Sequence, residues 1–204
     1  GVFWAASRRV SIGTNDMTTP NVADIRQVFA TKSIWIVALM AFVCFAVYSF
    51  VTAWIPTYLT EGLGVTLAFG GLVSAVFPAI GIVGRSTSGF VSDRFFGHRR
   101  RPVAILTFLI TAPALVAIAF VPIVAVVAGA LVLAGRFVQL GIGLFFAQAR
   151  EIPNQNVAAT AIAMVTSLST LGGFFALFLG GYLIERFDYV TAFVFMTAIT
   201  LFEF

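Results

Sequence analysis

Charged and reactive side chains are what this sequence of 204 residues has least of. Only 10% of its residues are Asp, Glu, Lys or Arg, against about 25% in a soluble globular domain. Its one cysteine, Cys44, lies inside an apolar run, and a single cysteine excludes a disulfide within the chain. Its one histidine, His98, lies in a charged loop. No nucleophile–base pair and no metal-ligand spacing can be assembled, so the sequence predicts no enzyme, no metal site and no cofactor.

Hydrocarbon is what the sequence has in excess. Hydrophobic residues make up 60% of the chain, and its mean hydropathy is +1.05. Several apolar runs exceed the roughly 18 residues that mark a candidate membrane-spanning helix. The net charge of +4 comes from loops that would face anionic lipid, so it predicts contact with the bilayer and no nucleic-acid partner. The expected fold class is an all-α polytopic membrane bundle.

About six transmembrane helices are expected, and together they form a membrane domain over residues 33–204. The approximate spans are 33–59, 67–92, 102–121, 123–149, 157–184 and 190–204. The last is too short to cross about 30 Å of hydrocarbon at 1.5 Å per residue, so we expect it to be truncated.

Residues 1–32 are expected to hold the end of a preceding span and a cytoplasmic linker. The chain opens without Met, which suggests that an N-terminal part of a longer protein precedes it. Within the linker, Thr19-Pro20 is a plausible helix start, and Val22, Ile25 and Phe29 then fall on one face. Two alternatives stay open for this segment, a short helix on the membrane surface and an unstructured linker.

The distribution of Lys and Arg predicts the orientation. The expected outer loops hold only Arg186, and segment 61–65 has neither Lys nor Arg. The expected inner segments hold Arg8, Arg9, Arg26, Lys32, Arg94, Arg99, Arg100, Arg101 and Arg150. Because positive loops stay on the cytoplasmic side, the N-terminus of this segment should be cytoplasmic.

The sequence also contains an internal echo. Residues 89–94 and 181–186 both read glycine, aromatic, aliphatic, any residue, acid, arginine. Three membrane crossings separate the copies, so they would lie on opposite faces of the membrane. This arrangement predicts an inverted repeat of three spans plus three.

The loop after the second span resembles a known family signature. In the major facilitator superfamily, the loop between the second and third spans of each half reads roughly Gly-x-x-x-Asp-Arg-x-Gly-Arg-Arg. The residues that fall on this pattern are Gly89, Asp93, Arg94, Gly97, Arg99 and Arg100. The chain departs from it by placing two residues, Phe95 and Phe96, before the glycine and by interposing His98.

The resemblance covers essentially the whole chain and implies the C-terminal six-helix half of a transporter. Such a half would join the missing N-terminal six-helix half in the plasma membrane, the cell inner membrane in bacteria. The implied function is secondary active transport of a small solute by alternating access, as a symporter or an antiporter. The six motif residues are implied to form a cytoplasmic gating motif in which Asp93 latches the closed side. An ordinary interfacial charge is the alternative for Asp93, and lipid-headgroup anchoring is the expected role of Arg99–Arg101.

Five residues are candidates for contact with the substrate. Arg136 lies near the middle of the fourth span, where an arginine costs about 2.5–3.5 kcal/mol, so it must have a partner. Gln139, three residues on, is expected to share its face. Arg85 lies about two turns inside the membrane from the Asp-Arg motif. Tyr48 and Thr52 form a polar pair on the first span.

An unpaired mid-membrane guanidinium would suit an organic or inorganic anion, which offers a bidentate partner. For both arginines a structural hydrogen bond, or an acid in the other half, is the alternative. No Asp, Glu or His is expected at mid-membrane, so a proton-coupling carboxylate would belong to the other half. A non-transporting membrane sensor or scaffold, or an inactive fragment, remains an alternative for the whole chain.

Overall fold

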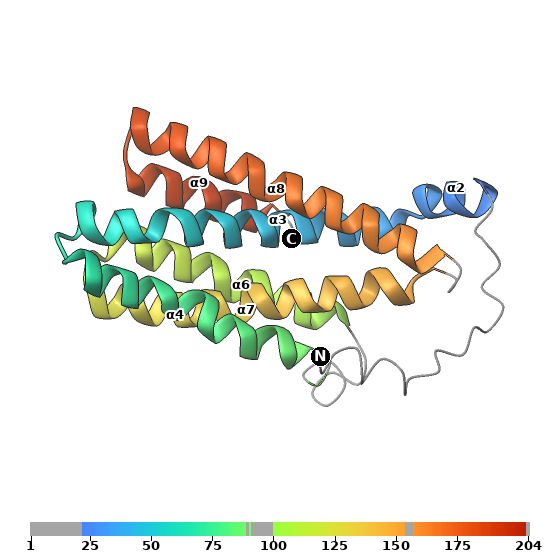
Figure 1. Cartoon of the computed structure of the whole chain (residues 1–204), viewed down its shortest axis with the longest axis horizontal. Helices are drawn as coiled ribbons and strands as arrows, with labels where there is room; N and C mark the ends of the chain where they lie inside the picture. The colour runs from blue at the N-terminus through green and yellow to red at the C-terminus, as the bar shows by residue number, and fades with distance from the viewer. Residues whose placement is uncertain (1–21, 89, 91–99, 154–156, 203–204) are drawn as a thin grey trace, which may run out of the picture.

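The computed structural model describes residues 22–88, 90, 100–153 and 157–202. Within these residues the chain is helical throughout, with short turns and no strand, which confirms the expected all-α class. Figure 1 shows long helices lying side by side along the longest axis of the molecule. The elements are α2 (Val22–Ala30), α3 (Lys32–Thr57), a π-helix η1 (Tyr58–Gly62), α4 (Leu67–Ser86), α6 (Arg100–Phe120), α7 (Val124–Glu151), α8 (Ala158–Arg186) and α9 (Tyr189–Leu201).

Five segments of the described chain are long and apolar enough to cross a membrane. They are α3 continued by η1, then α4, α6, α7 and α8, and their mean hydropathy lies between 1.9 and 2.5. Helix α9 is apolar but has only 13 residues. The expected polytopic helical bundle is therefore confirmed, and the chain is a multi-pass membrane protein.

Of the two alternatives for the segment before the first span, the structure has the helix. In α2 the packed residue is Val28, which is 1% exposed, whereas Phe29 is 50% exposed. The expected membrane-facing side of α2, which contains Phe29, is thus directed away from the bundle, and its contact with the membrane surface stays a prediction; the helix packs against α3 and α8. The indole Nε1 of Trp35 donates a hydrogen bond of 2.8 Å to the carbonyl of Phe29 and ties the two helices together.

The order and pairing of the helices follow an inverted repeat. From α3 onward, with η1 continuing α3, consecutive helices run in alternate directions, so α3 and α7, which begin the two triplets, point in opposite directions (Figure 1). Lys32 and Val124, at their starts, are 92 positions apart (124 minus 32), as are the two glycines of the sequence echo, Gly89 and Gly181. The most extensive packing joins α3 to α8 and α4 to α7. In the repeat, α3 corresponds to α7, α4 to α8 and α6 to α9. Replacing each helix by its counterpart turns the pair α3–α8 into the pair α7–α4, as an inverted repeat requires.

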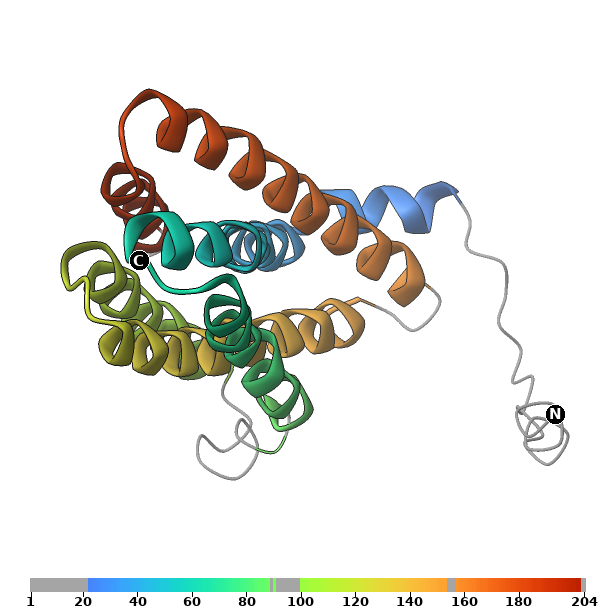
Figure 2. The same cartoon turned by 60° about the vertical axis from the view of Figure 1, so that its left-hand side comes forward.

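Glycines bring the backbones of both pairs close together. A Cβ at Gly84 would lie 2.5 Å from the carbonyl oxygen of Arg136, and one at Gly135 would lie 2.6 Å from that of Phe77. In the other pair, a Cβ at Gly172 would collide with the carbonyl oxygen of Phe42. Small residues permit such approaches in membranes, where helix association depends on close packing. Figure 2 shows the result, with α8 on one side of α3 and the α4–α7 pair on the other.

Apart from Arg85 and Arg136, which lie within the spans, the described charges lie at the two ends of the bundle with opposite bias. Among the described side chains, the end that carries α2 holds Arg26, Lys32, Arg150 and one acid, Glu151. The opposite end holds Glu61, Glu185, Arg186 and Asp188. The tertiary structure therefore gathers the positive charge at one end, and the cytoplasmic location of that end stays a prediction.

Candidate functional site

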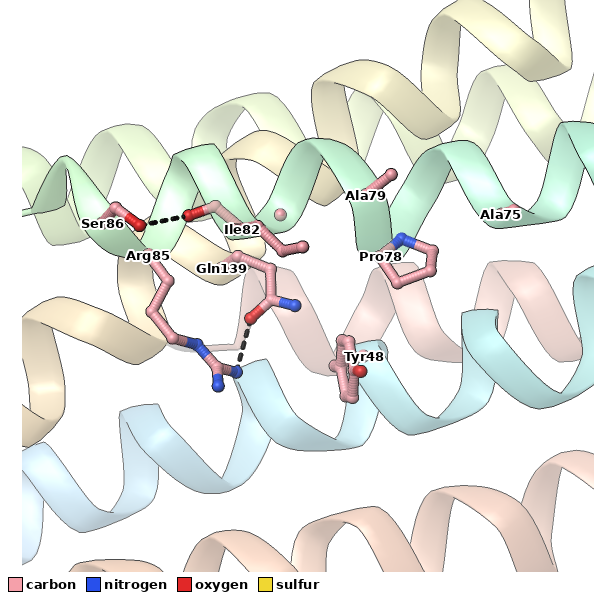
Figure 3. A pocket seen from close by; sticks show the side chains of 9 residues that line it. Tyr48, Ala75, Pro78, Ala79, Ile82, Arg85, Ser86 and Gln139 are labelled. Atoms are coloured by element: carbon pink, nitrogen blue, oxygen red, sulfur yellow. Dashed lines mark hydrogen bonds between the residues drawn. The ribbon is translucent and has the colours of Figure 1, made fainter. Parts of the chain in front are cut away.

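Helices α3, α4 and α7 line a partly open cavity of about 540 Å³, shown in Figure 3. Its volume falls within the range of small-molecule sites, roughly 300–1,000 Å³. Most of the wall is small or apolar, and the polar groups come from all three helices. The lining residues are Tyr48, Ala75, Pro78, Ala79, Gly81, Ile82, Arg85, Ser86 and Gln139.

A hydrogen bond between α4 and α7 organises the polar part of the cavity. The Nη2 of Arg85 donates to the Oε1 of Gln139 over 2.6 Å. Gln139 is only 5% exposed, and a buried amide requires partners. In Figure 3 the amide nitrogen of Gln139 points away from Arg85, into the space between Pro78 and Tyr48. The bond therefore fixes both the guanidinium and the amide at the wall of the cavity.

Tyr48 forms the α3 side of the cavity. Its ring stacks on Phe77 of α4, with a centroid distance of 5.8 Å and an interplanar angle of 28°. Phe45, on its own helix, packs against the ring at 5.8 Å and 53°. These contacts hold the tyrosine side chain across the cavity from Pro78, where its hydroxyl is available to a ligand (Figure 3).

The structure thus brings together three of the five candidate residues, Tyr48, Arg85 and Gln139. Thr52 is exposed one turn further along α3 and does not line the cavity. Arg136 does not line it either. Its Nη1 donates a hydrogen bond of 2.6 Å to the hydroxyl of Thr87 at the end of α4.

Arg136 and Gln139, expected to act on one face, diverge in the structure. They are about 60° apart around α7, and α4 packs directly against this part of the helix. Gln139 reaches Arg85 and Arg136 reaches Thr87. Because Arg85 and Thr87 are two residues apart, they project from nearly opposite sides of α4. The two side chains of α7 therefore straddle α4, and only Gln139 faces the cavity.

Most of the proposed gating motif lies outside the described residues. This applies to Gly89, Asp93, Arg94, Gly97 and Arg99, while Arg100 is the first residue of α6. The latch role of Asp93 stays a prediction.

Of the α4 wall of the cavity, the sequence predicted only Arg85. Ala75, Pro78, Ile82 and Arg85 recur at intervals of three and four residues, which places them on one face of a helix. This spacing of three and four residues, which ends at Arg85, was the sequence signal that could have predicted the rest of the wall.

Metal ligation has no support among the residues that the structure describes. They contain no group of three or more His, Cys, Asp or Glu side chains that could hold a metal ion.

Comparison with known families decides the identity of the bundle. Residues 6–177, well over half of the chain, match the family model of the Major Facilitator Superfamily. The chain belongs to the Major Facilitator Superfamily. The resemblance that the charged loop suggested is confirmed.

Two curated members of this superfamily are similar to the chain. The glycerol-3-phosphate transporter of Bacillus subtilis (strain 168) is 29% identical over 185 residues, which cover 88% of this chain and 41% of that protein. The nitrite extrusion protein of the same organism is 26% identical over 155 residues, which cover 74% of this chain and 37% of that protein. The chain thus spans about two fifths of the length of these relatives.

Proposed function

We propose that this chain is one half of a secondary active transporter for a small anion. A second six-helix half would complete the substrate pathway, and alternating access would expose it to each side of the membrane in turn. The observation that carries the proposal is the guanidinium of Arg85, held by Gln139 at the wall of a cavity between three membrane helices.

The cavity offers hydrogen-bond donors to an anion. Arg85 is a permanent cation with five N–H donors in a planar fork, which suits carboxylate, phosphate and other oxyanions. The amide nitrogen of Gln139 and the hydroxyl of Tyr48 add further donors. None of the nine lining residues is acidic, so no carboxylate in the wall competes for the guanidinium.

The names of the relatives agree with this chemistry. One is named for glycerol 3-phosphate, a phosphate ester, and the other for nitrite, an inorganic oxyanion. Both solutes are anions that accept hydrogen bonds. Because the two solutes differ in size, the proposed substrate class is named only as a small anion.

The two arginines receive separate roles in this proposal. Arg85 contacts the substrate because its guanidinium lines the cavity. Arg136 joins α7 to α4 through Thr87 and supports the wall from the other side. The alternative is that Arg136 contacts the substrate, as its depth in the membrane suggests. The transport assay described next separates the supporting role from substrate contact.

The test uses the protein expressed from its complete coding sequence and reconstituted in liposomes. Uptake of labelled nitrite, glycerol 3-phosphate and neutral glycerol is measured for wild type, Arg85→Ala and Arg136→Ala. We expect uptake of an anion in preference to glycerol. In Arg85→Ala the half-saturation concentration of that anion should rise about tenfold or more, because the variant loses a hydrogen bond from a charged group. Preference for glycerol, or unchanged uptake by Arg85→Ala, would contradict the proposal. Binding of an anion without uptake would indicate a sensor.

A further inference from the structure

Gly81 of α4 lies directly against the side chain of Gln139. A Cβ at this position would lie 2.7 Å from the Nε2 and 2.9 Å from the Cδ of Gln139, and it would collide with the Cγ. Gly84 and Gly135, in the same helix pair, are instead closest to backbone carbonyl oxygens. Gly81 therefore leaves space for one particular side chain, whereas its neighbours leave space for a helix crossing.

The side chain that fills this space has a fixed orientation. A guanidinium carries only donors, so the end of the amide that meets Arg85 must be its oxygen. The nitrogen then lies at the other end, and Figure 3 shows it turned into the cavity. Gln139 is 5% exposed, and a Cβ at Gly84 would lie 3.2 Å from its Cβ, so packing and the bond to Arg85 together hold the amide in this position.

We propose that Gly81 is a positioning residue for the anion site, and this inference rests on the proposed function. Its missing side chain admits the amide of Gln139, which holds Arg85 with its oxygen and presents its nitrogen to the anion. A methyl group at position 81 displaces the amide, releases Arg85 and removes the second donor. The α4–α7 crossing persists in that variant, because its close backbone contacts are made at Gly84 and Gly135.

The first measurement compares Gly81→Ala with a matched control on the same helix. Gly71 has nothing within 4 Å of its Cβ position, so Gly71→Ala adds the same methyl group without a contact. The labelled probes are nitrite and glycerol 3-phosphate, with the complete protein in liposomes. We expect Gly81→Ala to raise the half-saturation concentration of the transported anion about three- to tenfold, with the maximal rate nearly unchanged. The melting temperature should fall as well, because the variant also loses the hydrogen bond between Arg85 and Gln139. Gly71→Ala should behave as wild type.

A double-mutant cycle with Gln139→Ala shows whether Gly81 acts through that side chain. If it does, Gly81→Ala changes nothing further in the Gln139→Ala background, because the side chain that the methyl group displaces is already gone. Additive effects of the two substitutions, or an unchanged half-saturation concentration in Gly81→Ala, would overturn the inference. Loss of anion uptake in Arg85→Ala without any effect of Gly81→Ala would overturn only the positioning role and leave the proposed function intact.

A second readout does not depend on transport. Phenylglyoxal modifies guanidinium groups, and peptide mass spectrometry gives the rate at Arg85 alone. Gly81→Ala and Gln139→Ala should each raise this rate to a similar level, whereas Gly71→Ala should leave it unchanged. Equal rates in wild type and Gly81→Ala would overturn the positioning role even if neither anion were transported.

Discussion

Arg136 and Thr87 are joined by a hydrogen bond of 2.6 Å from a guanidinium nitrogen to a hydroxyl oxygen. The bond connects the middle of α7 to the end of α4. A guanidinium at this depth must have a polar partner, and here the partner lies within the same six-helix unit. Arg136 thus has an anchor that requires neither a bound anion nor an acid from another part of the protein.

This bond predicts a stability defect for Arg136→Ala. Hydrogen bonds to charged groups contribute about 1.5–3 kcal/mol, so the variant should unfold at a lower temperature. Thr87→Val should show a similar loss, and the double variant should lose little more than either single one. Thermal unfolding of the detergent-solubilised protein measures all three. Wild-type stability combined with a raised half-saturation concentration for the anion would instead place Arg136 in contact with the substrate.

Gln139→Glu should inactivate the anion site. The carboxylate occupies the same space as the amide but carries a charge, so it pairs with Arg85 and competes with the anion. We expect the half-saturation concentration for the transported anion to rise more than about tenfold, a cost above roughly 1.4 kcal/mol. Gln148→Glu, on the same helix but away from the cavity, is the matched control. Equal affinity in wild type and Gln139→Glu would remove Arg85 from the site.

The contact between α3 and α8 depends on Gly172. A Cβ there would collide with the backbone carbonyl of Phe42, which cannot move as a side-chain tip could. Gly172→Ala should therefore destabilise the protein by about 1–3 kcal/mol, the usual cost of overpacking. Gly129→Ala, whose added methyl group meets nothing within 4 Å, should cost much less. A thermal unfolding series compares them, and equal melting temperatures would contradict the close approach.

The orientation predicted from the positive charges can be tested at two exposed positions. Thr66, at the start of α4, and Ile152, after the end of α7, lie at opposite ends of the bundle. Each is replaced by cysteine in a Cys44→Ala background. An impermeant thiol reagent added to intact cells should label Thr66→Cys and leave Ile152→Cys unlabelled until the cells are broken. The reverse pattern would invert the topology.

Asp188 caps the start of α9, and the contribution of this cap to the stability of the fold depends on pH. Its Oδ1 accepts a hydrogen bond of 2.6 Å from the backbone N–H of Thr191. Hydrogen bonding by the Thr191 side chain, and secondly by this backbone N–H, holds the pKa of the carboxyl group below the ordinary 3.8. Because the folded-state pKa is lowered, the stabilisation is present above the ordinary pKa and disappears as the pH falls through the lowered value.

The Asp188→Ala variant measures that contribution. It should unfold at a lower temperature than wild type at neutral pH, and the difference should shrink as the pH falls below about 4, the ordinary range of an aspartate. Asp188→Asn, which also caps helices well, should retain most of the stability at neutral pH. A difference between Asp188→Ala and wild type that did not change with pH would show that the cap does not act through the charged carboxylate.

The sequence alone determined the class of protein, the helices and the repeat. Long apolar runs must form helices in a bilayer, because only a helix satisfies its own backbone hydrogen bonds there, so composition was enough to predict the bundle. The 92-residue spacing of the sequence echo recurs in the starts of α3 and α7, since equivalent segments of a repeat fold into equivalent helices. The depth of Arg136 within its span also followed from simple counting along the chain.

Only the tertiary structure decided which polar side chains meet. Spacing along α7 placed Arg136 and Gln139 about 60° apart, close enough to share a face in isolation. Helix α4 packs between their two directions, since Gly84 and Gly135 let the two helices approach closely, and it separates the two side chains. The same approach gives Arg85 its partner and makes Gly81 a neighbour of the amide. Periodicity along one helix fixes depth and direction, whereas the partner of a side chain depends on where a second helix crosses, and that crossing is set by packing between residues far apart in sequence.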